Sequence, residues 1–186
     1  MHGLIKNEQV DMILTNLEIL KQTKKKNITI EPFSKELLNP NSYNYRLDYE
    51  LLEFDGDLDA KKECIPRKII LTEDGYVLQP NKLYLGSTRE KIGSKKYLTQ
   101  LIGRSSVGRL GLFLQVTAPI GHIGTNHKWT LELKVVEPLR VYPLMRIGQV
   151  SFWKIKGSKK INYNQGEYKN YQTAQVSKFY KELQWF

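Results

Sequence analysis

Cysteine is nearly absent from this chain of 186 residues, which contains Cys64 and no other. A lone cysteine excludes an intrachain disulfide, and we therefore expect a cytoplasmic protein. The sequence contains no run of 18 or more apolar residues, so it predicts no membrane-spanning helix. The first residues also lack the apolar segment and small-residue cleavage site of a secretory signal, and none is expected.

Motifs for metals and for common nucleotide sites are missing as well. The three histidines are His2, His122 and His127, and no Cys-x-x-Cys or His-x-Glu pair accompanies them. The zinc-deaminase pattern is therefore absent, and we expect no zinc and no protein-bound metal. Neither a Walker-type phosphate loop nor a dinucleotide fingerprint occurs, so a phosphate site must be built in another way.

Acidic residues are in short supply, with 19 Asp and Glu against 29 Lys and Arg and a net charge of +10. Such a balance attracts polyanions, which include nucleic acid, an anionic membrane surface and phosphorylated small molecules. The densest basic cluster, 24–26, is predicted to be a solvated turn between two elements. No zinc finger, aromatic RNA-binding motif or basic heptad repeat accompanies it, so nucleic acid is an unlikely partner.

The apolar pattern predicts one short helix followed by many short strands. Apolar residues recur at spacings of three and four over 8–22, at Val10, Ile13, Leu14, Leu17 and Leu20. After residue 28, strands are expected at 43–54, 68–71, 76–79, 82–88, 112–117, 129–136, 139–142 and 147–155, with a hairpin turn at Asp74-Gly75. This pattern predicts an all-β fold, a barrel or jelly roll.

The tail beyond residue 155 is polar and rich in tyrosine, and it shows no clear period. Disordered tails are usually poor in aromatic residues, so we expect an arm that lies on a surface, its own or a neighbour's. The predicted organisation is therefore a β domain with an N-terminal helix over 1–155 and a C-terminal arm over 156–186.

The residues 103–112, Gly-Arg-Ser-Ser-Val-Gly-Arg-Leu-Gly-Leu, form what we call the arginine–serine segment. Small residues let the backbone approach a ligand closely, and successive N–H groups can form a concavity for an anion. Arginine adds a planar fork that suits phosphate oxygens. The segment is therefore a candidate phosphate site, although a glycine-rich turn with surface arginines explains the same residues.

A second informative segment is the predicted strand 129–136. Strand alternation places Thr130, Glu132 and Lys134 on one face and Leu131 and Leu133 on the other. If the first face lines a pocket that excludes water, the Glu132 carboxylate is suited to shuttle protons. A surface glutamate beside Lys134 is the alternative reading.

The arginine–serine segment resembles the signature of deoxycytidine triphosphate (dCTP) deaminases and their trimeric dUTPase relatives. Other stretches resemble the family in the same order, at 41–47, 78–90, 130–133 and 139–152. The resemblance covers roughly residues 28–181. It implies a distorted β-barrel or jelly roll of the dUTPase type, with the C-terminal arm covering the active site.

The resemblance also implies roles for single residues. Glu132 matches the general acid and base, which takes a proton from the water that attacks C4 of cytosine. Ser105 and Arg109 match residues that hold this water and the charges around it. Backbone groups of Thr130 and Leu131 would contact the base edge. The residues implied to bind substrate are Arg104, Ser105, Ser106, Val107, Gly108, Arg109, His122, Thr130, Leu131, Tyr163 and Gln172.

The implied assembly is a homotrimer with active sites between subunits, acting on a pyrimidine deoxynucleoside triphosphate. Magnesium would be carried by the triphosphate and not by a dedicated protein site.

The sequence departs from the family at two places. His122 stands where most members have an aspartate, which orients the attacking water in dUTPases and contacts the deoxyribose in deaminases. Glu167 stands where the family has a lysine that contacts the triphosphate. We therefore expect metal-independent hydrolysis of dCTP to dUTP and ammonia. The alternatives are a bifunctional enzyme that goes on to dUMP, and a nucleotide-binding regulatory protein on the same scaffold.

Overall fold

The structure is a computed structural model that describes residues 12–114, 117–157 and 171–183. Its helices are α1 (Asn16–Lys24), the 3-10 turn η1 (Lys35–Leu37), α2 (Ser105–Gly108) and α3 (Phe179–Glu182). The strands, in chain order, are β1 (Ile28–Glu31), β2 (Leu38–Asn39), β3 (Ser42–Arg46), β4 (Glu50–Glu53), β5 (Arg67–Ile70), β6 (Tyr76–Leu78), β7 (Tyr84–Ser94), β8 (Leu98–Gly103), β9 (Leu112–Leu114), β10 (Ile120–Gly121), β11 (Asn126–Val135), β12 (Leu139–Val141) and β13 (Arg146–Trp153).

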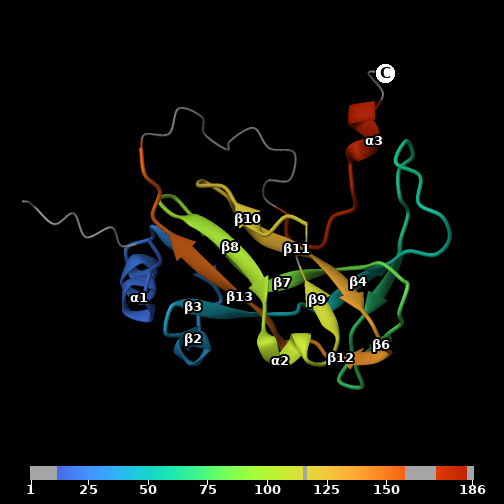
Figure 1. Cartoon of the computed structure of the whole chain (residues 1–186), viewed down its shortest axis with the longest axis horizontal. Helices are drawn as coiled ribbons and strands as arrows, with labels where there is room; N and C mark the ends of the chain where they lie inside the picture. The colour runs from blue at the N-terminus through green and yellow to red at the C-terminus, as the bar shows by residue number, and fades with distance from the viewer. Residues whose placement is uncertain (1–11, 115–116, 158–170, 184–186) are drawn as a thin grey trace, which may run out of the picture.

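The strands form two main sheets and one small one (Figure 1). The larger sheet has the order β5-β4-β7-β11-β9, with β1 also paired to β7. The second has the order β10-β8-β13-β3-β2, and β12 pairs with β6. These pairings are antiparallel. The predicted all-β class with a short N-terminal helix is confirmed.

One apolar core lies between the two main sheets. Tyr43 and Phe152 from the five-stranded sheet are fully buried, as are Ile92 and Leu131 from the six-stranded sheet, and all belong to one packed cluster. Large buried side chains dominate the free energy of packing, because each removes well over 100 Å² from water. This core therefore fixes the relative position of the strands that carry the site.

The predicted helix over 8–22 is wrong at its start. The helix begins at Asn16, and Thr15 caps it by accepting a hydrogen bond from the backbone N–H of Glu18. Before the cap the chain is extended, because the Leu14 N–H donates to the carbonyl of Phe152 at 2.9 Å and so adds to the edge of β13. Residues 8–11 lie outside the described part of the chain. The lysines 24–26 are exposed between α1 and β1, as predicted.

The single strand predicted over 43–54 is wrong, because the chain changes sheet in the middle of it. The Leu47 N–H donates to Met145 at 3.0 Å, whereas the next N–H, of Asp48, donates to Ser87 at 2.9 Å. The first half is therefore β3 in one sheet and the second half is β4 in the other. Aromatic alternation predicts extended backbone but not the partner strand.

The hairpin predicted at Asp74-Gly75 is also wrong. A turn does form there, with Gly75 at φ +70 and its N–H donating to the carbonyl of Thr72 at 3.0 Å. The strands on either side do not pair with each other, since β5 pairs with β4 and β6 pairs with β12. The turn residues fix the local backbone, whereas the pairing is decided by the sheets.

Two buried carboxylates belong to the framework. Glu90 on β7 is 0% exposed and accepts hydrogen bonds from the Arg46 side chain at 2.6 Å and the Arg46 backbone at 2.8 Å. Glu53 on β4 is 1% exposed and accepts from Arg67, Lys82 and Tyr84. Burial raises the pKa of Glu53, but these hydrogen bonds outweigh it and leave the pKa below its usual value.

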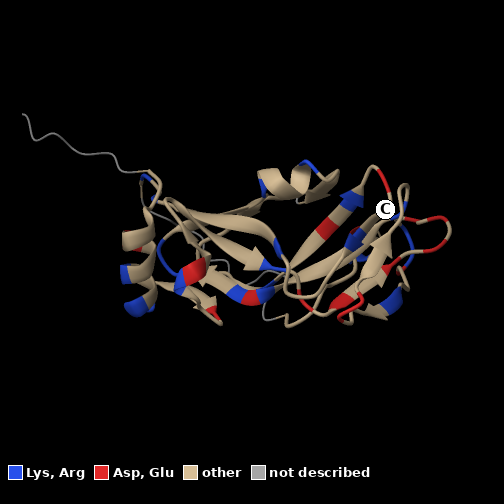
Figure 2. Cartoon of the chain, turned by 90° about the horizontal axis from the view of Figure 1, so that it is seen from below, with Lys and Arg blue, Asp and Glu red and all other residues tan. Residues whose placement is uncertain are grey.

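Charged side chains gather at both ends of the molecule (Figure 2). Lysines mark α1 at one end, and acidic residues mark the loop 55–63 after β4 at the other. No described helix is long and apolar enough to cross a lipid bilayer.

Candidate functional site

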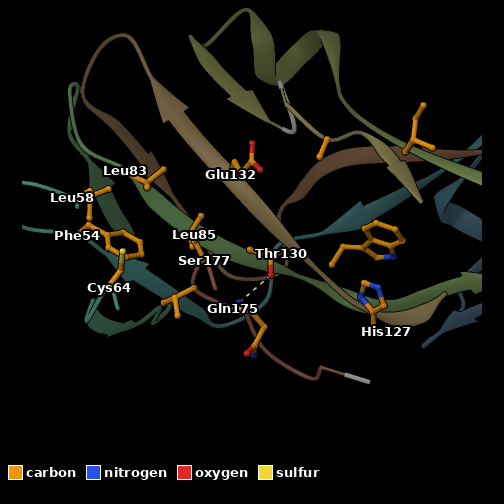
Figure 3. Close-up of a pocket in the computed structure, with 14 residues that line it drawn as sticks. Phe54, Leu58, Cys64, Leu83, Leu85, His127, Thr130, Glu132, Gln175 and Ser177 are labelled. Carbon is orange, nitrogen blue, oxygen red and sulfur yellow. Dashed lines mark hydrogen bonds between the residues drawn. The ribbon is translucent and has the colours of Figure 1, made fainter. Parts of the chain in front are cut away.

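A pocket of about 560 Å³ opens beside β11 (Figure 3). One wall is β11, a second is the start of β7 with the loop that follows β4, and a third is the described end of the C-terminal arm. Its described lining residues are Phe54, Leu58, Cys64, Leu83, Leu85, Ala118, Ile120, His127, Trp129, Thr130, Glu132, Gln175, Val176 and Ser177.

Glu132 lies on the pocket side of β11 and is half-buried. Its sequence neighbours Leu131 and Leu133 are fully buried in the core, so the alternation of the strand turns Glu132 the other way. Thr130 shares this face and Lys134 is exposed beyond it, which confirms the predicted alternation. The carboxylate thus lies on a strand that is paired on both sides, by β7 and β9, beside largely apolar walls, a setting suited to moving a proton.

The chain changes its pairing register next to this carboxylate. Lys128 pairs with Lys91 and Thr130 pairs with Ser87, so Trp129 alone lies opposite residues 88–90 of β7. Such an irregularity bends a strand and redirects its side chains. Here the extra residues belong to β7, and the alternation of buried and less buried residues along β11 continues unbroken. The pocket is lined by residues of both parities on β11, namely His127 and Trp129 together with Thr130 and Glu132.

Trp129 is fixed in place by its surroundings. The indole N–H donates to the carbonyl of Ile92 at 3.0 Å, and its backbone N–H donates to the Thr88 hydroxyl at 2.9 Å. Gly121 on β10 lies against the ring, since a Cβ atom there would come within 2.2 Å of it. Any other residue at 121 would displace the ring and the pocket wall that it forms.

Residues 171–177 of the arm dock on the same strand. The Gln175 N–H donates to the Thr130 hydroxyl at 3.0 Å, and the Lys128 N–H donates to the carbonyl of Tyr171 at 3.1 Å. Between these contacts, Ala174 is buried against an apolar cluster that includes Phe54 and Leu85. The docked segment closes one side of the pocket.

The arginine–serine segment lies elsewhere. It leaves the end of β8 and forms the short helix α2, with Val107 buried in the core. Arg104 donates to the carbonyl of Arg146 at 3.1 Å, and Ser105 and Arg109 are exposed. The described lining of the pocket includes no residue from 103–112. A single copy of the chain therefore does not bring this segment to Glu132 in the part that the structure describes.

The other predicted site residues are dispersed. His122 is exposed in the turn between β10 and β11, and Gln172 is exposed at the start of the docked arm. Ser106 is exposed and Gly108 partly buried in α2, whereas the Leu131 side chain is in the core. Tyr163, like Glu167, lies outside the described residues.

Several pocket residues are not predicted from the sequence. Phe54, Leu85 and Gln175 come from segments far apart in the chain, and their meeting depends on the fold. His127 belongs to no sequence motif. Its place two residues before Trp129, just ahead of the predicted strand 129–136, is only a weak indication that it lines a site. The alternation that reveals Glu132 is a local pattern and can be read directly.

The described residues contain no group of three or more His, Cys, Asp or Glu side chains placed to hold a metal ion.

Comparisons with known proteins agree on one family. A family model described as dCTP deaminase-like matches residues 13–155. A protein of Hathewaya histolytica named "dCTP deaminase, dUMP-forming" is 47% identical over 174 residues, covering 93% of this chain and 100% of the relative. Proteins with the same name from Clostridium beijerinckii and Cytophaga hutchinsonii are each 46% identical, covering 93% of this chain and 99% of the relative.

A solved structure shows the same fold. The 2'-deoxycytidine 5'-triphosphate deaminase of Agrobacterium tumefaciens matches with a TM-score of 0.63 at 18% identity. The match covers 77% of this chain and 48% of that one, so this chain spans about half the length of the structural neighbour.

Proposed function

Because the chain belongs to the dCTP deaminase-like family, we propose that it converts dCTP to dUMP, with release of ammonia and pyrophosphate. The observation that carries this proposal is the near-full-length likeness, at 46 to 47% identity, to relatives named as dUMP-forming. The pocket supports it, because it holds a half-buried carboxylate on a rigid strand.

The first reaction is hydrolytic deamination at C4 of cytosine. Glu132 takes a proton from water, the oxygen adds to C4, and the carboxylic acid then delivers the proton toward the departing amino group. One water is consumed, the C4–N bond breaks, and dUTP and ammonia result. The largely apolar walls formed by Leu83 and Leu85 keep bulk water from competing for this proton.

The second reaction is hydrolysis between the α- and β-phosphoryl groups. A second water adds to the α-phosphorus, the bond to pyrophosphate breaks, and dUMP remains. The sequence alone favours dUTP as the end product, because His122 replaces the family aspartate. The names of the close relatives favour dUMP, and we adopt this product.

We further propose that a second copy of the chain completes the site. The exposed Ser105 and Arg109 carry donors for phosphate oxygens, yet they lie outside the pocket of their own chain. A homotrimer with sites between subunits would bring this segment to the Glu132 of a neighbour. The docked arm, 171–177, would close the third side.

Magnesium would enter with the substrate. The cation would be held mainly by phosphate oxygens, which are the hard oxygen ligands that magnesium prefers. Bound magnesium would neutralise charge on the triphosphate, and Arg104 and Arg109 would position the triphosphate.

Product analysis tests the function. Purified protein is incubated with dCTP and magnesium, ammonia is assayed, and the nucleotides are separated by anion-exchange chromatography. We expect dUMP and pyrophosphate in equal amounts with ammonia. Accumulation of dUTP would show deamination alone, and calorimetric binding without turnover would favour the regulatory alternative. Glu132→Gln is the matched control for contaminating activity.

A further inference from the structure

His127 presents a hydrogen-bond acceptor to the pocket. Its Nδ1 lies 2.8 Å from the carbonyl oxygen of Lys128. A carbonyl oxygen only accepts, so Nδ1 carries the hydrogen and donates it. In the neutral ring the other nitrogen, Nε2, then has a lone pair. Among the described residues, Nε2 has no hydrogen-bond partner.

The ring is held in one orientation and kept uncharged. It is 7% exposed and lies against Trp129 with ring centroids 4.6 Å apart. Burial lowers the pKa of His127 below its ordinary value, and the hydrogen bond to Lys128 opposes this only in part. At neutral pH the ring therefore accepts a hydrogen bond without placing a negative charge near a triphosphate.

The carbonyl that orients the ring is itself anchored. The Lys128 N–H donates to Tyr171 of the arm at 3.1 Å, and its ammonium group contacts Asp48 at 2.5 Å. Asp48 is 8% exposed, so this ion pair is largely shielded from water. Docking of the arm thus fixes the backbone group that sets the direction of His127.

The position of His127 restricts what it can contact. It lies five residues from Glu132 on β11, roughly 16 Å along a strand at about 3.3 Å per residue. Deoxycytidine triphosphate has two uncharged hydrogen-bond donors, the 4-amino group and the sugar 3'-hydroxyl. The amino group is on the carbon atom that reacts beside Glu132, so the hydroxyl is the donor left for the distant end of the pocket.

We propose that Nε2 of His127 accepts a hydrogen bond from the 3'-hydroxyl of the bound deoxynucleotide and makes this hydroxyl a requirement for tight binding. The inference rests on the proposed function, since it assumes that the base lies at Glu132. Because deamination leaves the sugar unchanged, His127 holds substrate and deaminated intermediate in the same way.

The test compares dCTP with 2',3'-dideoxycytidine triphosphate, which lacks the hydroxyl. Binding is measured by calorimetry and turnover by ammonia release, with the full chain and with His127→Phe and His127→Gln. We expect the wild type to prefer dCTP about tenfold, the usual effect of one hydrogen bond. The Phe variant keeps a ring beside Trp129 but loses the acceptor, so its preference falls to about one. The Gln variant keeps part of the preference for dCTP. In both variants we expect KM for dCTP to change more than kcat.

Several outcomes would overturn the inference. If the wild type binds dCTP and the dideoxynucleotide with equal affinity, the inference is wrong. It is also wrong if His127→Phe loses the same factor of affinity for both nucleotides. A variant that loses affinity for dCTP but not for dUTP would show that His127 contacts the amino group instead. A wild type that binds dCTP without releasing ammonia contradicts the proposed function alone, and the affinity ratio still decides the role of His127.

Discussion

The arginine–serine segment and strand β11 differ in how their composition relates to their place in the structure. The first gathers arginines, serines and glycines within ten positions, yet it folds as the exposed turn α2 outside the pocket. The second carries one glutamate among apolar residues, yet it supplies four of the residues that line the pocket. A dense motif therefore need not lie at the pocket of its own chain, whereas a plain amphipathic strand can form a wall of that pocket.

The largest expected effect tests the role given to β11. Glu132→Gln keeps the shape and removes the proton acceptor, so we expect kcat for ammonia release to fall by about 10²–10⁴, the usual contribution of a general base. Ammonia release at saturating dCTP measures it, with calorimetry to show that dCTP still binds. A variant with near wild-type turnover would remove Glu132 from the mechanism.

The next effect tests whether the two regions meet between subunits. Arg109→Ala would remove the charge-assisted hydrogen bonds to phosphate that we propose for this side chain, and we expect kcat/KM to fall roughly 10- to 100-fold. Co-refolding this variant with Glu132→Gln should recover part of the activity, because some sites then combine one intact copy of each region.

The matched control for this mixture pairs Glu132→Gln with a chain that carries both substitutions, and it should recover nothing. Size-exclusion chromatography with light scattering checks that mixed assemblies form. If they form and activity stays absent, each chain completes its own site.

A smaller effect tests the contact of the arm with β11. Thr130→Val removes the hydroxyl that accepts from the Gln175 N–H, at nearly constant volume. One neutral hydrogen bond is worth about 1 kcal/mol, so we expect KM for dCTP to rise roughly fivefold and the Gln175 amide to exchange faster. Thr130→Ser retains the hydroxyl and is the control. Equal exchange rates in the two variants would mean that this bond does not hold the arm.

The smallest effect concerns pH. Because burial keeps the folded-state pKa of His127 below that of the unfolded chain, the unfolded state takes up the proton first on acidification. This contribution to stability is complete above about pH 6.5 and is lost as pH falls from there toward the folded-state pKa. Thermal unfolding between pH 7.5 and 5 should show a slightly smaller loss of Tm for His127→Gln than for the wild type.

Local patterns in the sequence predict much of β11 and little of its surroundings. The alternation of Leu131 and Leu133 with Glu132 is a property of any half-buried strand, and it correctly gives the face of the carboxylate. The all-β class follows from the number of short strands. The start of α1 is missed because Ile13 and Leu14 fit a helical spacing, although Ile13 pairs with Trp153 of β13.

The sequence does not predict which strands pair with each other or which distant segments meet at the pocket. Two strands, β3 and β4, lie where one was predicted over 43–54. The change of sheet at Leu47 depends on its backbone hydrogen bonds with Leu144 and Met145, which are distant in sequence. The same holds for the pocket, where Phe54 and Gln175 meet only through tertiary contacts. The roles assigned to Ser105 and Arg109 stay predictions, since they depend on how copies of the chain assemble.

The change of register at Trp129 has a consequence for protein engineering. Grafting residues 126–135 onto a regular antiparallel sheet would deprive Trp129 of the longer stretch of β7 that it faces, because a regular ladder sets one residue opposite one. A transplanted version must therefore bring along the extra residues of β7, 88–90, and with them the Thr88 hydroxyl that accepts from the Trp129 backbone N–H. The smallest segment that could be transferred to another protein is therefore the pair of strands β7 and β11 with the change of register between them. Strand β11 alone would not reproduce the pocket wall.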